Sequence, residues 1–125
     1  MRITTGARGG RWAYLFETLE TLCRVLEIKA DLGVRLKKAY DTRDTAVLRR
    51  IAGEDLPALN DRLTILYEAF RRQWFTENKP FGWEVQSIRL GGLQARIREA
   101  KHTVEDYLKG RLARIPELEE ERLFY

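Results

Sequence analysis

Apolar residues recur at the helical period over three long segments of the chain. In the first segment, residues 12–40, large apolar side chains return at steps of three, four and seven positions, the spacing of one helix face. This face is wider than the seam of a two-stranded coiled coil, so we expect the helix to pack against two neighbours. Its apolar positions are Leu15, Leu19, Leu22, Val25, Leu26, Leu32, Leu36, Ala39 and Tyr40.

The second segment, residues 45–77, carries a helical stripe that is interrupted once. Gly53 is a poor helix former and Pro57 has no amide hydrogen to donate. We therefore predict a kinked or broken pair of helices, at residues 45–53 and 56–77. The apolar positions are Val47, Leu48 and Ile51, followed by Leu59, Leu63, Leu66, Phe70 and Trp74.

The third segment starts near position 82 or 83 and ends near Gly110, because glycine suits a position just beyond a helix end. The pair Gly91–Gly92 lies in its middle and costs on the order of 1–2 kcal/mol of helix stability. Either the helix kinks there or a neighbouring backbone or ring lies against the pair. We expect a similar close approach at Gly33 of the first helix. The inner positions are Val85, Ile88, Gly92, Ala95, Ile97, Ala100, Val104, Tyr107 and Leu108.

Together the three segments predict an all-α fold. It is an antiparallel three-helix bundle with long helices, in which the second helix is broken near Gly53–Pro57. Residues 1–11 are rich in glycine and are expected to form a flexible leader or a linker remnant. Residues 12–125 are expected to form the helical bundle domain, with the apolar tail end at residues 123–125 docked on the bundle.

The stretch between the second and third helices, residues 71–93, has the most unusual composition. It holds two of the three tryptophans, a proline and three of the nine glycines. One interpretation is a helix–helix corner that plugs one end of the bundle. The other is a loop that presents Trp83, Glu84 and Arg89 to a ligand or partner.

Charge and hydropathy exclude several classes of partner. The net charge of +4 comes from 23 basic and 19 acidic residues that interleave, so no basic face builds up and we expect no nucleic acid partner. No apolar run approaches the roughly 20 residues of a membrane span, and the N-terminus lacks the apolar core of a signal peptide. We expect no membrane partner and a cytoplasmic location, which the single Cys23 permits.

The residue types that most enzymes use for chemistry are scarce. The single histidine, His102, falls off the apolar stripe and is expected to be solvated, while Cys23 is expected to be a small core residue. One histidine and one cysteine are too few for any zinc pattern. We therefore predict no catalytic residue, no metal and no cofactor in this chain.

One resemblance is specific enough to name a family. Residues 78–82 read Asn-Lys-Pro-Phe-Gly, and residues 89–92 read Arg-Leu-Gly-Gly. With these motifs the chain resembles the C-terminal helical region of bacterial β-N-acetylhexosaminidases of glycoside hydrolase family 20. Residues 29–36 and 115–123 are also similar to that region, so the resemblance covers nearly the whole chain after the leader.

The resemblance implies a partner rather than an activity of this chain. In that family a (β/α)₈ barrel carries catalysis through an adjacent Asp-Glu pair, with the acetamide of the substrate as nucleophile. This chain has no Asp-Glu dipeptide and no alternation of strands and helices that would build a barrel. It is therefore expected to be a non-catalytic domain that packs on the barrel of the same enzyme, and that meets N-acetylhexosamine-containing glycans only through it.

The same resemblance favours a working surface formed by Phe81, Trp83, Glu84 and Arg89, facing the catalytic domain or its sugar site. An indole suits the apolar face of a sugar ring, and a carboxylate and a guanidinium can bond sugar hydroxyls. In the alternative, Trp83 is a buried core plug and Arg89 pairs with Glu84 or Glu77. A free-standing helical protein-interaction module, unrelated to any enzyme, remains the alternative function.

Overall fold

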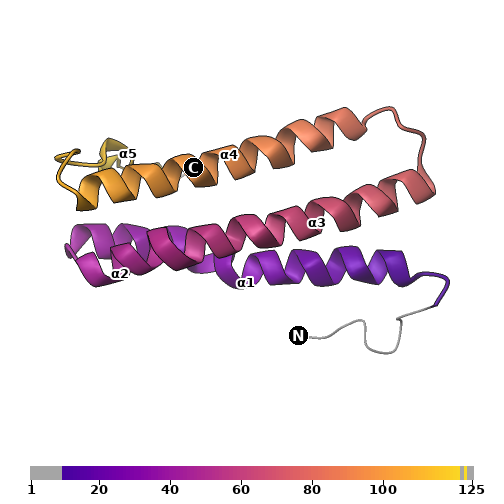
Figure 1. Ribbon diagram of the computed structural model, residues 1–125, viewed down its shortest axis with the longest axis horizontal. Coiled ribbons are helices and arrows are strands. Elements are labelled where there is room, and N and C mark those ends of the chain that lie inside the picture. Colours follow the sequence, from indigo (N-terminus) through magenta and orange to yellow (C-terminus); the bar gives the residue numbers. More distant parts are fainter. Residues whose placement is uncertain (1–9, 122, 124–125) are drawn as a thin grey trace.

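Three long helices dominate the computed structural model, which describes residues 10–121 and residue 123. They are α1 (Ala13–Asp41), α3 (Leu56–Glu77) and α4 (Trp83–Leu108), and they pack side by side (Figure 1). The described residues contain no strand. The predicted all-α bundle of three long helices is therefore confirmed.

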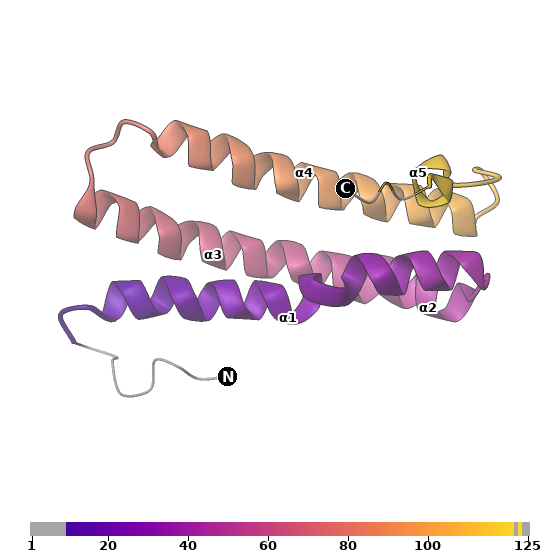
Figure 2. The same cartoon turned by 180° about the vertical axis from the view of Figure 1, so that it is seen from behind.

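The central helix is α3, which packs against both α1 and α4. It runs antiparallel to each of them, so α1 and α4 run parallel to one another on either side of it, as the front and back views show (Figures 1 and 2). No helix among the described residues is both long enough and apolar enough to cross a bilayer.

The predicted interruption of the second helix takes the form of a π-helical stretch. The short α2 (Thr45–Arg50) leads into η1 (Ile51–Asp55), and α3 follows with Pro57 in its first turn. The backbone stays right-handed helical at Ile51 and at Leu56. The chain axis therefore continues through this region, with one turn widened.

The core consists of two clusters. The larger one joins α1, α3 and α4 around Leu59 and Leu63, each 1% exposed. The second lies at the end of the bundle that holds α2 and the tail, and its buried members are Ala39, Tyr40, Leu48, Ala52, Val104 and Ile115.

The mid-helix glycines do not pack as predicted. A Cβ atom built on Gly33, Gly91 or Gly92 would have no heavy atom within 4 Å beyond its own helix and chain neighbours, and all three residues are exposed. The close approach expected at Gly33 is therefore wrong within the described residues, and so is the alternative of a neighbour against Gly91–Gly92. The face of α4 that holds the glycine pair points to solvent.

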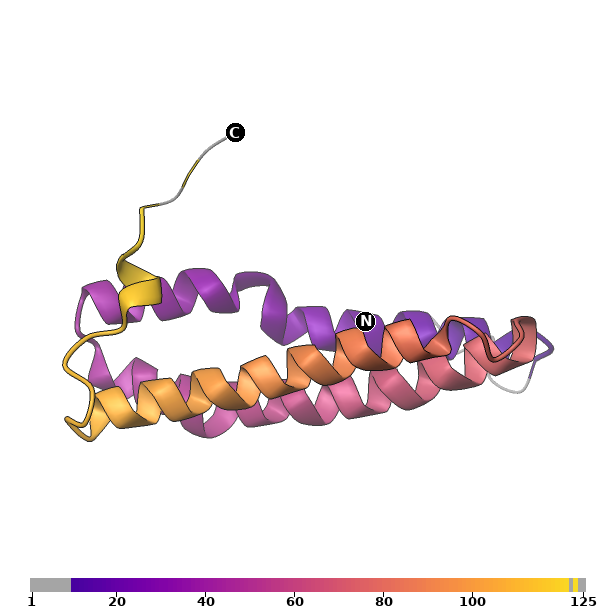
Figure 3. The same ribbon diagram turned by 90° about the horizontal axis from the view of Figure 1, so that it is seen from above.

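The tail docks on the bundle, but through residues other than those predicted. Ile115 is 4% exposed and packs in the second core cluster, and Leu118 of the short α5 (Pro116–Glu119) packs against it. Leu123, in contrast, is 73% exposed, and Phe124 and Tyr125 lie outside the described residues. From above, α5 lies over the end of the bundle where α1 and α4 finish (Figure 3).

Candidate interaction site at the corner between α3 and α4

The corner forms where the sequence stops one helix and starts the next. Asn78 leaves α3 with an extended backbone, φ −129° and ψ 165°. The chain then turns through Pro80, whose carbonyl oxygen accepts a hydrogen bond from the amide of Trp83 at 3.1 Å. Gly82 takes φ +95°, in the left-handed region that favours glycine, immediately before α4 begins.

Trp74 braces this turn from inside. Its indole Nε1–H donates a hydrogen bond to the main-chain oxygen of Lys79 at 3.0 Å. The same ring lies so close to Gly82 that an added Cβ would sit 3.0 Å from its Cζ2 atom. The turn is therefore fixed both by a polar contact and by shape, and only glycine fits the second contact.

Trp83 is buried at this corner, with 8% of its surface exposed. Its ring meets four others, at centroid distances of 5.3 Å to Tyr67, 5.5 Å to Phe70 and 6.1 Å to both Trp74 and Phe75. Tilted and edge-on aromatic contacts of this kind stabilise beyond the area they bury. The structure thus gives Trp83 the packing position of the two that the sequence allowed, and the indole is not presented to solvent.

The other three predicted residues lie on the surface of the corner. Phe81 is 87% exposed at the apex of the braced turn. Glu84 accepts a hydrogen bond from the Gly82 amide through Oε2 at 3.0 Å, so its carboxylate stabilises the start of α4. Arg89 is exposed, and in the part of the chain that the structure describes it pairs with neither Glu84 nor Glu77. The prediction that these residues meet a partner stays a prediction.

The structure adds two apolar residues to this surface. Val85 and Ile88 are 42% and 73% exposed, although the sequence pattern placed both on the inner face of the helix. They lie three residues apart and so share one side of the first turns of α4. The error arose because apolar character alone does not separate a core face from a docking face.

The corner is also tied to the first helix. The Tyr14 hydroxyl donates to Oε1 of Glu77 at 3.2 Å, and desolvation, followed by the nearby Glu77 carboxylate, raises the pKa of Tyr14. An ion pair of 3.2 Å joins Arg72 and Glu17 one turn further along. These contacts join the end of α3 to the start of α1.

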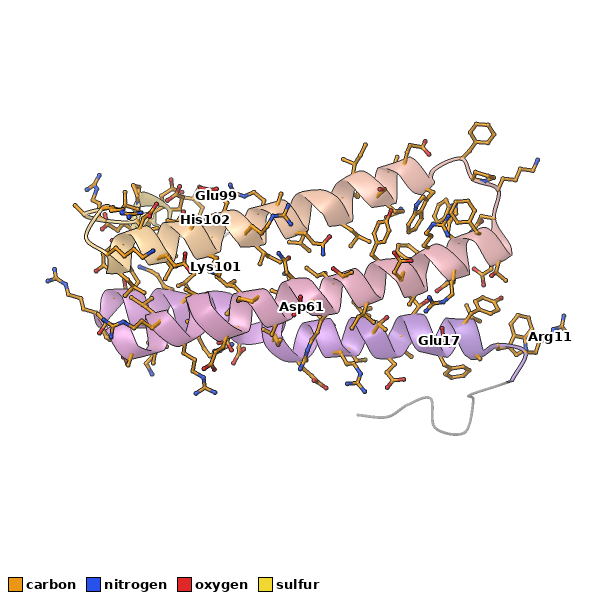
Figure 4. The ribbon with its side chains drawn as sticks, in the orientation of Figure 1. Arg11, Glu17, Asp61, Glu99, Lys101 and His102 are labelled. Carbon is orange, nitrogen blue, oxygen red and sulfur yellow. The ribbon has the colours of Figure 1, made fainter. Side chains whose placement is uncertain are left out.

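No group with catalytic geometry accompanies this surface. His102 is exposed and lies on α4 far from the corner (Figure 4). Cys23 is half-buried with a free thiol. Among the described residues no three His, Cys, Asp or Glu side chains gather in a group that could hold a metal ion. What the corner offers is a braced apolar residue with a carboxylate and a guanidinium nearby, which suits binding rather than reaction.

Comparison with known families identifies the family of the chain. The sequence matches the family described as Glycoside Hydrolase 20C C-terminal domain over residues 2–125. The chain belongs to this family. A comparison with curated proteins gives no match.

Membership of the glycoside hydrolase 20C C-terminal domains confirms the resemblance seen in the sequence. The chain is a helical domain of a family 20 glycoside hydrolase, and it is associated with the catalytic domain of that enzyme.

Proposed function

We propose that this C-terminal domain packs on the catalytic (β/α)₈ barrel of a β-N-acetylhexosaminidase through the α3–α4 corner. In this arrangement Phe81, Glu84 and Arg89 face the barrel near its sugar site, and Trp83 supports them from behind. The enzyme as a whole removes terminal N-acetylhexosamine residues from glycans, and this chain supplies no catalytic group.

The observation that carries the proposal is the combination of exposure and rigidity at Phe81. Its side chain is 87% exposed, while the turn beneath it is held by the Trp74–Lys79 hydrogen bond and by the contact of Trp74 with Gly82. Exposing a phenylalanine to water costs free energy, and fixing it in place removes the entropy that would be lost on binding. This is the arrangement expected of an anchor that inserts into a partner.

Glu84 and Arg89 add groups that can form directional hydrogen bonds to this surface. The Glu84 carboxylate is fixed at the start of α4 by the Gly82 amide, and the Arg89 guanidinium has no ion-pair partner among the described residues. A guanidinium can donate two parallel hydrogen bonds to a carboxylate or to neighbouring hydroxyls. Arg89 is therefore available to a barrel side chain or to a sugar.

The test uses the intact enzyme with Phe81→Ala and a matched control, Val34→Ala, which truncates an exposed side chain on α1 (60% exposed). We expect Phe81→Ala to raise KM for an aryl N-acetylglucosaminide by roughly three- to tenfold, with kcat less affected. The control is expected to leave KM unchanged.

Two results would contradict the proposal. Unchanged KM together with an unchanged thermal unfolding profile of the Phe81→Ala enzyme would show that the corner touches neither barrel nor substrate. Turnover by the 125-residue chain alone, surviving repurification, would show that the chain is itself catalytic.

A further inference from the structure

An apolar strip on α1 is covered at one end of the bundle and uncovered at the other. Leu22 and Leu36 lie fourteen residues apart, and positions seven apart on a helix share a side with a drift of only about 20°. At the covered end Leu36 packs in the second core cluster, beside Ile115 and Leu118 of the tail. At the other end Leu19, Leu22 and Leu26 are 43%, 40% and 45% exposed. We call these three leucines the leucine strip.

The covered end shows what kind of segment fits this side of the bundle. The segment is acidic and amphipathic, with the two aliphatic residues Ile115 and Leu118 turned to the helices and four glutamates around them. Tyr40 receives it: its hydroxyl donates to Glu119 at 2.6 Å and accepts from the amide of Ile115 at 2.9 Å. A cavity of about 220 Å³ remains beneath the segment, lined among others by Leu36, Arg96, Ile115 and Glu117.

Two arginines lie on one side of α4, the helix that forms part of the wall of this cavity. On α4, Arg96 and Thr103 line the cavity under the tail. Arg89 lies seven residues before Arg96 and so shares that side of the helix. Because α1 and α4 run parallel (Figure 1), Arg89 on α4 and Leu22 on α1 both lie toward the end of the bundle away from the tail, with α3 between the two helices.

Lys29 adds a third cation on the α1 side, between Leu22 and Leu36. Lys29, Arg89 and Arg96 are all exposed, and in residues 10–121 none of them takes part in an ion pair. The side of α1 that carries the exposed leucines therefore also carries an unpaired cation, Lys29. The chemistry of this side is complementary to the acidic aliphatic segment that covers the other end.

From this continuity we infer that the leucine strip is a second docking surface, and that it binds an acidic amphipathic segment of the catalytic domain. The segment presents aliphatic side chains to Leu19, Leu22 and Leu26, and its carboxylates face the cations beside them. Only the identity of the partner rests on the proposed function, while the strip and its chemistry are independent of the α3–α4 corner.

Exposed Gly33 fits the same picture. It lies seven residues after Leu26, on the same side of α1, and has open space where a side chain would be. A bound segment could approach the α1 backbone closely there. Gly33, which no other helix of the bundle contacts closely, would then pack against the bound segment.

The experiment titrates the 125-residue chain with the separately produced catalytic domain of the enzyme, by calorimetry. Leu22→Glu and Leu26→Glu place a negative charge on the strip at positions already exposed, so the bundle itself should stay folded, as circular dichroism will show. Val34→Glu is the matched control, since Val34 is 60% exposed and lies on another side of α1. We expect each strip variant to weaken binding at least tenfold and the control to bind as the wild type does.

A second pair of variants tests the charges. Lys29→Glu with Arg96→Glu should weaken binding and reduce its dependence on salt, because it removes the attraction for carboxylates. Lys38→Glu, an exposed lysine on a different side of α1, is the control and should change binding far less.

The outcomes separate the two proposals. If the wild-type chain fails to bind the catalytic domain, both the proposed function and this inference are overturned. If it binds and the strip variants bind equally well, this inference alone is overturned. If light scattering shows that the chain pairs with itself, and Leu22→Glu abolishes the pairing, then a second copy covers the strip and the inference is likewise overturned.

Discussion

The indole of Trp74 reaches across the corner between α3 and α4 and donates its hydrogen to the main-chain oxygen of Lys79, at 3.0 Å. This bond links the last turns of one helix to the loop that starts the next. It holds the turn on which Phe81 stands, and it places the ring against Gly82. At this corner Trp74 supports the turn, while Phe81 is exposed on it.

Gly82→Ala should destabilise the chain. The substitution forces a side chain onto a backbone with φ +95° and places its Cβ 3.0 Å from the Trp74 ring. A strained backbone of this kind costs about 1–3 kcal/mol. Urea unfolding followed by circular dichroism measures the loss, and an unchanged midpoint would show that the turn relaxes without strain.

Gly91→Ala and Gly92→Ala should have the opposite effect. Both glycines are helical, and beyond its own helix backbone and chain neighbours neither has a heavy atom within 4 Å of the position that a Cβ would take. Alanine removes backbone entropy from the unfolded chain, so each variant should gain up to about 1 kcal/mol in the isolated chain. A loss of stability in the same urea experiment would mean that the pair sits against a neighbour after all.

Trp83→Ala and Phe81→Ala should differ sharply in the isolated chain. Removing the buried Trp83 ring from its aromatic cluster leaves a cavity and should cost about 3–5 kcal/mol. Truncating Phe81, which is 87% exposed, should change stability by no more than about 0.5 kcal/mol. Equal losses in the two variants would refute the division between a supporting and a presented residue.

Tyr40→Phe should loosen the tail. The variant leaves the buried amide of Ile115 without its acceptor and removes the donor to Glu119. We expect a melting temperature lower by a few degrees. Tyr107→Phe, which alters the neighbouring ring 5.3 Å away, is the control, because the Tyr107 hydroxyl makes no hydrogen bond within the described residues.

The same bond predicts a pH dependence. Donation to the Glu119 carboxylate raises the pKa of Tyr40, so the folded state favours the protonated phenol. Its contribution is complete below the ordinary tyrosine pKa of about 10, and is lost as the pH rises through the higher folded value. The difference in melting temperature between wild type and Tyr40→Phe should therefore shrink at alkaline pH. A difference that stays undiminished as the pH rises above the ordinary tyrosine pKa would contradict the assigned role.

The sequence was sufficient for the helices because their signals are local. Apolar periodicity marked all three long helices, and Pro80 with Gly82 and Gly110 marked two of the boundaries. The irregularity predicted near Gly53 is present, but as a π-helical turn within continuous helical backbone and not as a break, a distinction that helix propensity does not make. Helix positions and helix ends depend mainly on the conformational preferences of the residues that form them.

The surfaces were harder to predict because they depend on tertiary placement. Trp83 suits a core plug and a sugar platform equally well by residue type, and only its four aromatic neighbours decide between them. The helical spacing and apolar side chains of Val85 and Ile88 predict core residues, yet the two are 42% and 73% exposed. Ile115 was missed as the anchor of the tail because its receiving group, the Tyr40 hydroxyl, lies far away in sequence.

The most direct test of the account places a photoreactive phenylalanine analogue at position 81 of the intact enzyme. Position 34, exposed but away from the corner, serves as the control. Irradiation followed by mass spectrometry is predicted to give a crosslink from position 81 to a peptide of the catalytic barrel, and none from position 34. A position 81 that reacts only with solvent, or only with another copy of this domain, would contradict the claim that the corner docks on the barrel.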